Sequence, residues 1–343
     1  AMAPPRGGRG ARARWALLSA LRLGAGQPAG LEPDFAVCNT PRGCGGEGAP
    51  RPQHFARDLL SRVGERAREV AAAGRTPLIL HVGSGTFGNT ALWTDVHLYS
   101  AVLSELPREP GAFRLVLVEP LGYKVPAIQR NVARLNVSSS GAQIVTAAVD
   151  KVCPAEWRTL YVVSQRAKAD LNTNMKVVGG WSSFNRAWVI NAARGFNRSV
   201  CREPCSQVCQ TLCPGVRPLI ASIEDYVEAT QVRCLTPSQL LAELRAEAGD
   251  VAMLAVDAEG ADLGIVEAFL GQAGFRPGFM QWEAEWKDAH RIVPQVREAG
   301  FSVGRGFGDQ ADGADSDNMY GLPLAGSEEA CTSGVCKPRS QLQ

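Results

Sequence analysis

The chain has 343 residues, of which 45% are hydrophobic and 20% charged, and its formal net charge is +2. This composition is typical of a globular protein with one sizeable core, and it excludes a wholly disordered chain. The small net charge argues against a nucleic-acid surface, because phosphate binding normally requires a strong excess of Lys and Arg. We therefore expect a small-molecule partner. No apolar run reaches the ~18 residues of a membrane helix, so no membrane span is predicted.

The chain opens on an Arg- and Ala-rich stretch that carries no acidic residue before Glu32. Such a stretch fits a transit peptide, a poor signal peptide, a leader without fixed structure or a short docking helix. Ala1 ahead of Met2 has the character of an expression scar. We predict an N-terminal extension and linker over 1–50, one catalytic domain over 51–325 with an insertion at 151–216, and a C-terminal tail over 326–343.

Regular structure is expected from residue 53 onwards. Apolar residues recur at helical spacing from Phe55 to Val70, and Gly74 stands where that helix would end. The buried strand that begins at Leu78 then runs into the turn Gly83-Ser84-Gly85. A strand, a glycine turn and a helix place several backbone N–H groups around one small space, as in a nucleotide cradle. A sharp reversal of the chain would explain the glycines equally well.

Alternating elements follow the glycine turn. We expect a helix over 92–106, a buried strand over 114–118, a helix over 125–135 and a strand over 143–149. This order predicts an α/β fold with a doubly wound, Rossmann-like parallel sheet. Glu119 closes the second strand, where an acid can bond ribose hydroxyls. It lies 36 residues after Gly83, which is longer than the roughly 20 residues of a dinucleotide fingerprint and disfavours NAD.

The insertion at 151–216 breaks this rhythm. Strands are expected at 157–163 and 186–191, and the whole segment is a candidate lid or substrate wall. Cys201, Cys205, Cys209 and Cys213 recur at intervals of four. Disulfides within this insertion, or to Cys153, Cys234 or the Cys331/Cys336 tail, are preferred over a zinc site or reduced thiols.

The rest of the chain resumes the alternation. Thr236 is a good N-cap for a helix over 237–248, and a buried strand covers 251–256. A helix over 263–270, a strand over 279–283 and another helix that ends at Gly300 follow, and two extended segments lie near Phe301 and at 318–320. The strand at 251–256 ends in Asp257-Ala258-Glu259-Gly260. Strand alternation would point both acids the same way, towards one substrate or a metal, although one of them could instead cap the next helix.

Several of these elements together resemble the FkbM family of S-adenosylmethionine-dependent methyltransferases, over roughly residues 75 to 322. The resemblance is carried by the motifs His81-Val-Gly-Ser-Gly85, Val118-Glu-Pro120, Trp181-Ser-Ser-Phe184, Asp257-Ala-Glu-Gly-Ala-Asp262 and Gln281-Trp-Glu283. It implies a seven-stranded methyltransferase sheet whose last strand is antiparallel, S-adenosylmethionine as cofactor, and methyl transfer to a hydroxyl of a small-molecule acceptor. The chain departs from the family pattern at His81, where an acid is usual, and at Ala255, where a Lys is usual.

These motifs give a set of expected site residues. Catalytic roles are assigned to Asp257, Glu259 and Glu283. Cofactor contacts are assigned to His81, Gly83, Ser84, Gly85, Glu119, Pro120 and Asp257. Substrate contacts are assigned to Trp181, Ser182, Ser183 and Trp282. No metal is expected. The alternatives are N- or C-methylation, or a methyltransferase-like binding protein with a decayed active site.

The compartment is only weakly indicated. The ten cysteines and the acceptor patterns for N-glycosylation at Asn136 and Asn197 lean towards an organelle or the secretory pathway rather than the cytoplasm.

Overall fold

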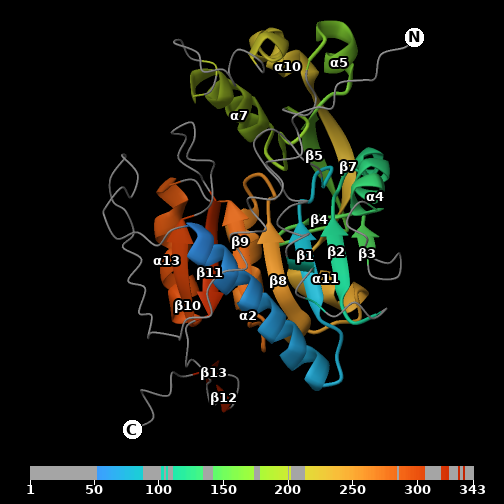
Figure 1. Ribbon diagram of the computed structural model, residues 1–343. Coiled ribbons are helices and arrows are strands. Elements are labelled where there is room, and N and C mark those ends of the chain that lie inside the picture. Colours follow the sequence, from blue (N-terminus) through green and yellow to red (C-terminus); the bar gives the residue numbers. More distant parts are fainter. Residues whose placement is uncertain are drawn as a thin grey trace, which may run out of the picture.

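The computed structural model describes residues 52–87, 102–103, 106, 111–133, 142–173, 178–199, 201, 213–283, 286–305, 318–323, 331–332 and 335–336. Its centre is a sheet with the strand order β10-β11-β9-β8-β1-β2-β3 (Figure 1). The strands are β1 Leu78–Val82, β2 Arg114–Val118, β3 Ala142–Val145, β8 Val251–Val256, β9 Phe279–Glu283, β10 Phe301–Arg305 and β11 Asn318–Pro323. β9, β8, β1, β2 and β3 are parallel, and β11 pairs antiparallel with β9 and β10. The predicted mixed α/β fold with a mostly parallel, Rossmann-like sheet is confirmed.

Helices cover both faces of this sheet. The helices are α2 Pro52–Ala72, α4 Val125–Ala133, α11 Pro237–Glu243, α12 Asp262–Leu270 and α13 Trp286–Glu298. α2 and α4 pack on the face to which Ile79 of β1 points, whereas α11, α12 and α13 pack on the face to which Leu78 and Leu80 point. Because both faces are covered, the central strands are apolar at nearly every position rather than alternating.

Two predicted helix boundaries are explained by their end residues. α2 ends ahead of Gly74, whose φ of +73° is easily reached only without a side chain. Thr236 caps α11, because its side chain accepts from the N–H of Gln239 while the Gln239 side chain accepts from the N–H of Thr236. The predicted helix over 92–106 lies almost wholly outside the described residues, as does the N-terminal extension.

A second, smaller unit stands over the carboxyl ends of β1, β2 and β8 (Figure 1). It is built on a sheet with the order β4-β7-β5-β6. Its strands are β4 Ala148–Val149, β5 Trp157–Val163, β6 Ser182–Ser183 and β7 Val227–Leu235. Its helices are α5 Arg166–Leu171, α7 Arg186–Ser199, α9 Arg217–Ala221 and α10 Ile223–Tyr226. These elements share a separate apolar core that includes Val163, Val189, Ile190 and Leu219.

Short elements complete the described chain. The 3₁₀ turns are η1 Gly122–Lys124, η2 Cys213–Gly215 and η3 Ala248–Asp250, and β12 Cys331–Thr332 pairs with β13 Val335–Cys336 in a two-stranded sheet.

The smaller unit and the segments next to it differ from the sequence prediction in three ways. The expected strand over 186–191 is wrong: these residues begin α7, because Asn185 Oδ1 accepts from the N–H of Ala187 and Val189, Ile190 and Ala193 bury one helical face. The expected strand over 143–149 is divided between β3 and β4, which belong to different sheets. β7, which was not predicted as a strand, pairs with every residue of β5. The small sheet therefore extends beyond residue 216.

Two disulfides hold the insertion. Cys153 is bonded to Cys234 of β7, and Cys201 is bonded to Cys213 within the cysteine run. Both agree with the preferred disulfide reading, whereas Cys205 and Cys209 lie outside the described residues. The disulfides are compatible with an oxidising, secretory-type environment. Within the described part of the chain, no helix has the length and apolarity needed to cross a membrane.

Candidate functional site

The strand order of the large sheet reverses between β1 and β8. From β1 the chain proceeds to β2 and β3 on one side, and from β8 it proceeds to β9 on the other. The loops that follow β1 and β8 therefore separate and leave a crevice at the carboxyl ends of the strands, which is where open α/β sheets bind ligands. The glycine turn after β1 and the acidic turn after β8 lie at this position.

Gly83 is the point where these two turns touch. A Cβ added to Gly83 would lie 1.7 Å from the carbonyl oxygen of Asp257, and the φ of Gly83 is +78°. The contact is held from both sides, since Asp257 N–H donates to the Val82 carbonyl and Gly83 N–H donates to the Val118 carbonyl, each at 2.9 Å. Only glycine allows the chain to turn here with the β8 loop so close.

Glu119 lies beside the glycine turn at the end of β2. Its carboxylate accepts from the N–H of Leu121 at 3.0 Å and lies 3.4 Å from Lys124 Nζ in η1. Burial raises the pKa of Glu119, while Lys124 and the N–H groups of Leu121 and Gly85 oppose that rise. Lys124 thus neutralises a buried acid that also contacts the backbone of the glycine turn.

The acidic turn after β8 is closed by Asp262 at the start of α12. The Asp262 carboxylate accepts from the N–H of Ala258 at 3.0 Å and from the N–H of Gly260 at 3.2 Å, which fixes the loop between them. Glu259 has a positive φ of 49°, which is uncommon for a residue with a side chain. Such backbone strain is concentrated at functional sites.

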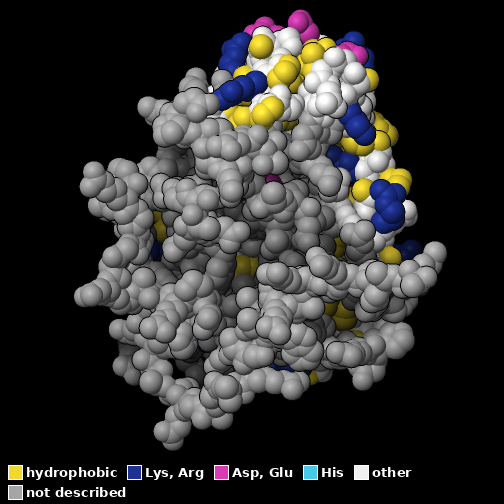
Figure 2. Space-filling view, turned by 45° about the horizontal axis from the view of Figure 1, so that its top comes forward, with side chains coloured by type: hydrophobic (Ala, Val, Ile, Leu, Met, Phe, Trp, Pro, Cys, Tyr) yellow, Lys and Arg dark blue, Asp and Glu magenta, His cyan; other side chains and the backbone are white. Residues whose placement is uncertain are grey.

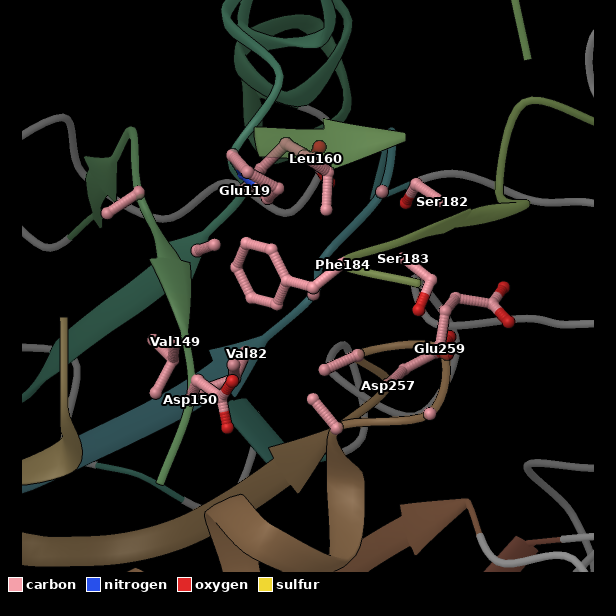
Figure 3. Close-up of a pocket in the computed structure, with 18 of the residues that line it drawn as sticks. Val82, Glu119, Val149, Asp150, Leu160, Ser182, Ser183, Phe184, Asp257 and Glu259 are labelled. Carbon is pink, nitrogen blue, oxygen red and sulfur yellow. The ribbon is translucent and has the colours of Figure 1, made fainter. Parts of the chain in front are cut away.

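Asp257 and Glu259 have different surroundings. Asp257 is exposed, whereas Glu259 is half-buried and its pKa is raised well above 4.5 by burial and by the neighbouring carboxylates of Asp257 and Glu283. β8 ends at Val256, so the expected strand alternation does not extend to these residues, and a turn presents both acids instead. Figure 3 shows Glu259 reaching from this turn towards Ser183 of the insertion.

The insertion supplies the opposite wall. The carboxylate of Glu259 comes so near Gly180 that a Cβ there would lie 3.2 Å from Oε1. The guanidinium of Arg158 lies 3.7 Å from the centroid of the Phe184 ring and is paired with Asp150. The Phe184 ring lies in the space between the two units, between Leu160 and Val82 (Figure 3).

These groups enclose one pocket of about 380 Å³, within the range of small-molecule sites. Its lining includes eight of the predicted site residues: Gly83, Gly85, Glu119, Pro120, Ser182, Ser183, Asp257 and Glu259. The remaining lining side chains are a mixture of apolar groups, such as Val149 and Leu160, and the charged groups Lys124, Asp150 and Arg158.

Five predicted site residues do not line the pocket. His81 is buried beneath it beside the Phe87 ring, and burial lowers the pKa of His81 to about 4. Ser84 donates its backbone N–H to the Val118 carbonyl and is also buried. Glu283 is half-buried at the end of β9 and acts on the pocket through its charge near Glu259.

The two tryptophans are core residues in this structure. Trp282 is fully buried in the core of the large sheet, and Trp181 packs against Phe196 in the core of the insertion. Neither lines the pocket, and their neighbours Ser182 and Ser183 line it instead.

Sequence reasoning missed Lys124, Asp150 and Arg158, and it named Phe184 as part of a motif without assigning it to the site. The position of Lys124, five residues after Glu119, was an available signal, because a turn after the strand brings it back to the acid. Asp150 follows β4 and Arg158 lies on β5, and both strands pair with the distant β7, an arrangement of which the local sequence carries no sign.

Comparison with known proteins gives no further guide. No protein-family model matches the chain, and no curated protein matches it at a significant level.

Proposed function

We propose that this protein is a methyltransferase that uses S-adenosylmethionine, and that it methylates a hydroxyl oxygen of a small molecule. The observation that carries the proposal is the convergence of Gly83, Glu119 and Asp257 around one pocket at the point where the strand order reverses. Support also comes from the resemblance of these motifs to the FkbM family. The sheet order, with β11 antiparallel to both of its neighbours, agrees with the methyltransferase sheet that this resemblance implies.

The pocket residues fit the cofactor in size and chemistry. Glu119 is the acceptor for ribose hydroxyls, since an ionised carboxylate has about four lone-pair sites and only part of them are used by Leu121 and Lys124. A Cβ on Gly85 would meet no atom within 4 Å, so this glycine borders open space through which a ligand can approach the backbone. Phe184, Leu160 and Val149 form an apolar wall suited to the adenine ring.

The acids after β8 are the candidates for proton transfer. The cofactor would supply a methyl group on a positively charged sulfur, so the chain must orient the acceptor hydroxyl and remove its proton. Asp257 is exposed to the pocket and is the proposed base. Glu259, whose pKa is raised by burial and by Asp257, is the carboxyl group better suited to holding a proton. Ser182 and Ser183 provide hydroxyls that can orient the acceptor.

A binding protein without catalysis is the second candidate. It is favoured by His81, because the buried, neutral imidazole stands where the family usually has an acid that contacts the cofactor. Methylation of nitrogen or carbon is the alternative within the enzyme class, and it needs the same cofactor pocket.

Methyl-transfer assays separate these readings. The full chain is incubated with S-adenosylmethionine labelled in its methyl group and with a library of hydroxylated small molecules, and labelled product is measured. Asp257→Asn keeps the shape of the side chain and should lower kcat by about 100-fold or more, as expected for loss of a base. A labelled methyl group on nitrogen or carbon of the product would replace O-methylation by N- or C-methylation. Turnover of Asp257→Asn at the wild-type rate would contradict the role of Asp257 as the base.

A further inference from the structure

A second cavity of about 570 Å³ lies beside the first. It is bounded by the η1 turn of the large unit and by β5 and β7 of the smaller unit. We call it the aromatic cavity, after Trp157 and Tyr123 in its lining. Of the residues that the structure describes, Pro120 alone lines both cavities. Between them, Leu121 is buried in one apolar cluster with Leu160 and Val232, which separates the two cavities.

Its aromatic rings are unusually exposed. Among the described residues, Tyr123, Val152 and Trp157 are the large apolar side chains that stand exposed, and the two aromatic ones are 50% and 57% accessible. Both of these line the cavity, one from each unit. Exposed aromatic rings gathered at a concave site indicate a binding surface, because their burial by a ligand is strongly favourable.

The charged groups of the aromatic cavity are already paired. Arg166 Nε lies 2.9 Å from Glu228 Oε1, and Arg233 Nη2 lies 2.8 Å from Glu243 Oε1. Arg166, Glu228 and Arg233 are the charged residues of the lining, so each has an opposite charge beside it. This neutralisation disfavours phosphates, sulfates and ammonium ligands. The visible face of the insertion has the same character, with basic, acidic and apolar side chains interspersed (Figure 2).

The uncharged polar groups are amides and hydroxyls. Gln165, Gln231 and Thr230 lie in the lining, and Gln231 Nε2 donates to Thr159 Oγ1 at 2.9 Å. That bond orients the Gln231 amide while its carbonyl oxygen keeps acceptor capacity. Side-chain amides both donate to and accept from hydroxyl groups, and aromatic rings pack on the C–H face of a sugar ring.

We propose that the aromatic cavity binds a neutral carbohydrate, with a sugar ring packed on Trp157 or Tyr123 and its hydroxyls bonded by Gln165 and Gln231. The site is distinct from the pocket assigned to the cofactor and does not depend on the function proposed for that pocket. A glycan bound there would be held next to the first pocket.

The test uses the full chain on an array of neutral, sialylated and sulfated glycans, followed by titration with the best neutral glycan in saturation-transfer NMR. The expected result is binding to neutral glycans, weakened about tenfold in Trp157→Ala and in Tyr123→Ala. Trp157→Phe should retain part of the affinity. Val152→Ala is the matched control, because Val152 is equally exposed but does not line the cavity.

Unfolding temperatures of all variants establish that they are folded. Absence of binding to any neutral glycan, binding to charged glycans alone, or full affinity in the folded Trp157→Ala and Tyr123→Ala variants would overturn the proposal. Binding of apolar peptides without binding of glycans would also overturn it and would assign the exposed rings to a protein partner.

Discussion

The carbonyl oxygen of Asp257 occupies the space beside Gly83 that any side chain would need, since a Cβ on Gly83 would lie 1.7 Å from it. The turn after β1 and the turn after β8 are therefore packed backbone to backbone at the centre of the pocket. This contact makes the glycine turn a structural requirement of the site, because it fixes the position of the acidic turn.

Gly83→Ala should be far more destabilising than loss of a left-handed glycine alone. We expect a cost of more than about 3 kcal/mol in the free energy of unfolding, since the Asp257 backbone must move. Gly74→Ala is the matched control: its φ is +73° but a Cβ there meets no atom within 4 Å, so it should cost about 1 kcal/mol. Urea denaturation measures both. Equal losses in the free energy of unfolding would mean that the loop after β8 moves away from residue 83 without cost, which would contradict the tight contact.

Glu119 and Lys124 can be separated by a double variant. Glu119→Gln leaves Lys124 buried without its carboxylate partner and should lower the free energy of unfolding by about 3 kcal/mol. Adding Lys124→Met removes the stranded charge and should restore most of that stability. Both the single and the double variant should bind S-adenosylmethionine at least about tenfold more weakly than the wild type, because the ribose loses its carboxylate acceptor. Affinity that recovers together with stability would argue against a direct contact.

His81 gives a specific dependence of stability on pH. Its pKa falls from 6.5 to about 4 on folding because the imidazole is buried. The unfolded chain therefore binds more protons between these values, so stability is complete above pH 6.5 and declines as the pH falls towards 4. The total effect is roughly 3 kcal/mol. The free energy of unfolding, measured by denaturation between these pH values, should fall less steeply with pH in His81→Asn than in the wild type. An equal fall in the two proteins would contradict the lowered pKa of His81.

Glu259 should act in the opposite direction. Burial and Asp257 raise its pKa above 4.5, so the folded chain binds more protons and stability is lost as the pH rises through the raised pKa. Glu259→Gln should leave stability unchanged below pH 4.5 and increase it at neutral pH. The control is Glu267→Gln, because Lys151 lowers the pKa of Glu267 and its loss should destabilise at neutral pH. A neutral-pH loss of stability in Glu259→Gln would contradict the raised pKa.

Much of the large sheet was predictable because its elements are defined by local sequence. β2 and β8 are continuous apolar runs that end in Glu119 and Asp257, and Thr236 and Gly74 mark helix ends by their own chemistry. Six of the eight predicted residues in the pocket lining could be named because they follow β1, β2 or β8 directly, and parallel strands bring their carboxyl ends to one edge. The other two, Ser182 and Ser183, form β6 and were named from their motif.

The insertion was less predictable because its structure depends on distant contacts. Residues 186–191 contain Trp188, Val189 and Ile190, which suit a strand, but the core of the insertion buries Val189, Ile190 and Ala193 along one helical face. Arg158 enters the pocket through the pairing of β5 with β7, whose paired residues, from Val163↔Val227 to Trp157↔Arg233, lie at least 64 residues apart in the chain. Trp282 looked like a substrate contact from its motif, yet its strand position buries it in the core.

The most direct test is calorimetric titration of the full chain with S-adenosylmethionine. The pocket of Gly83, Glu119 and Asp257 predicts saturable binding to one site, which is lost in Gly83→Ala and kept in Asp257→Asn. The absence of any binding heat from the folded wild-type chain at high-micromolar cofactor would contradict the proposed methyltransferase function.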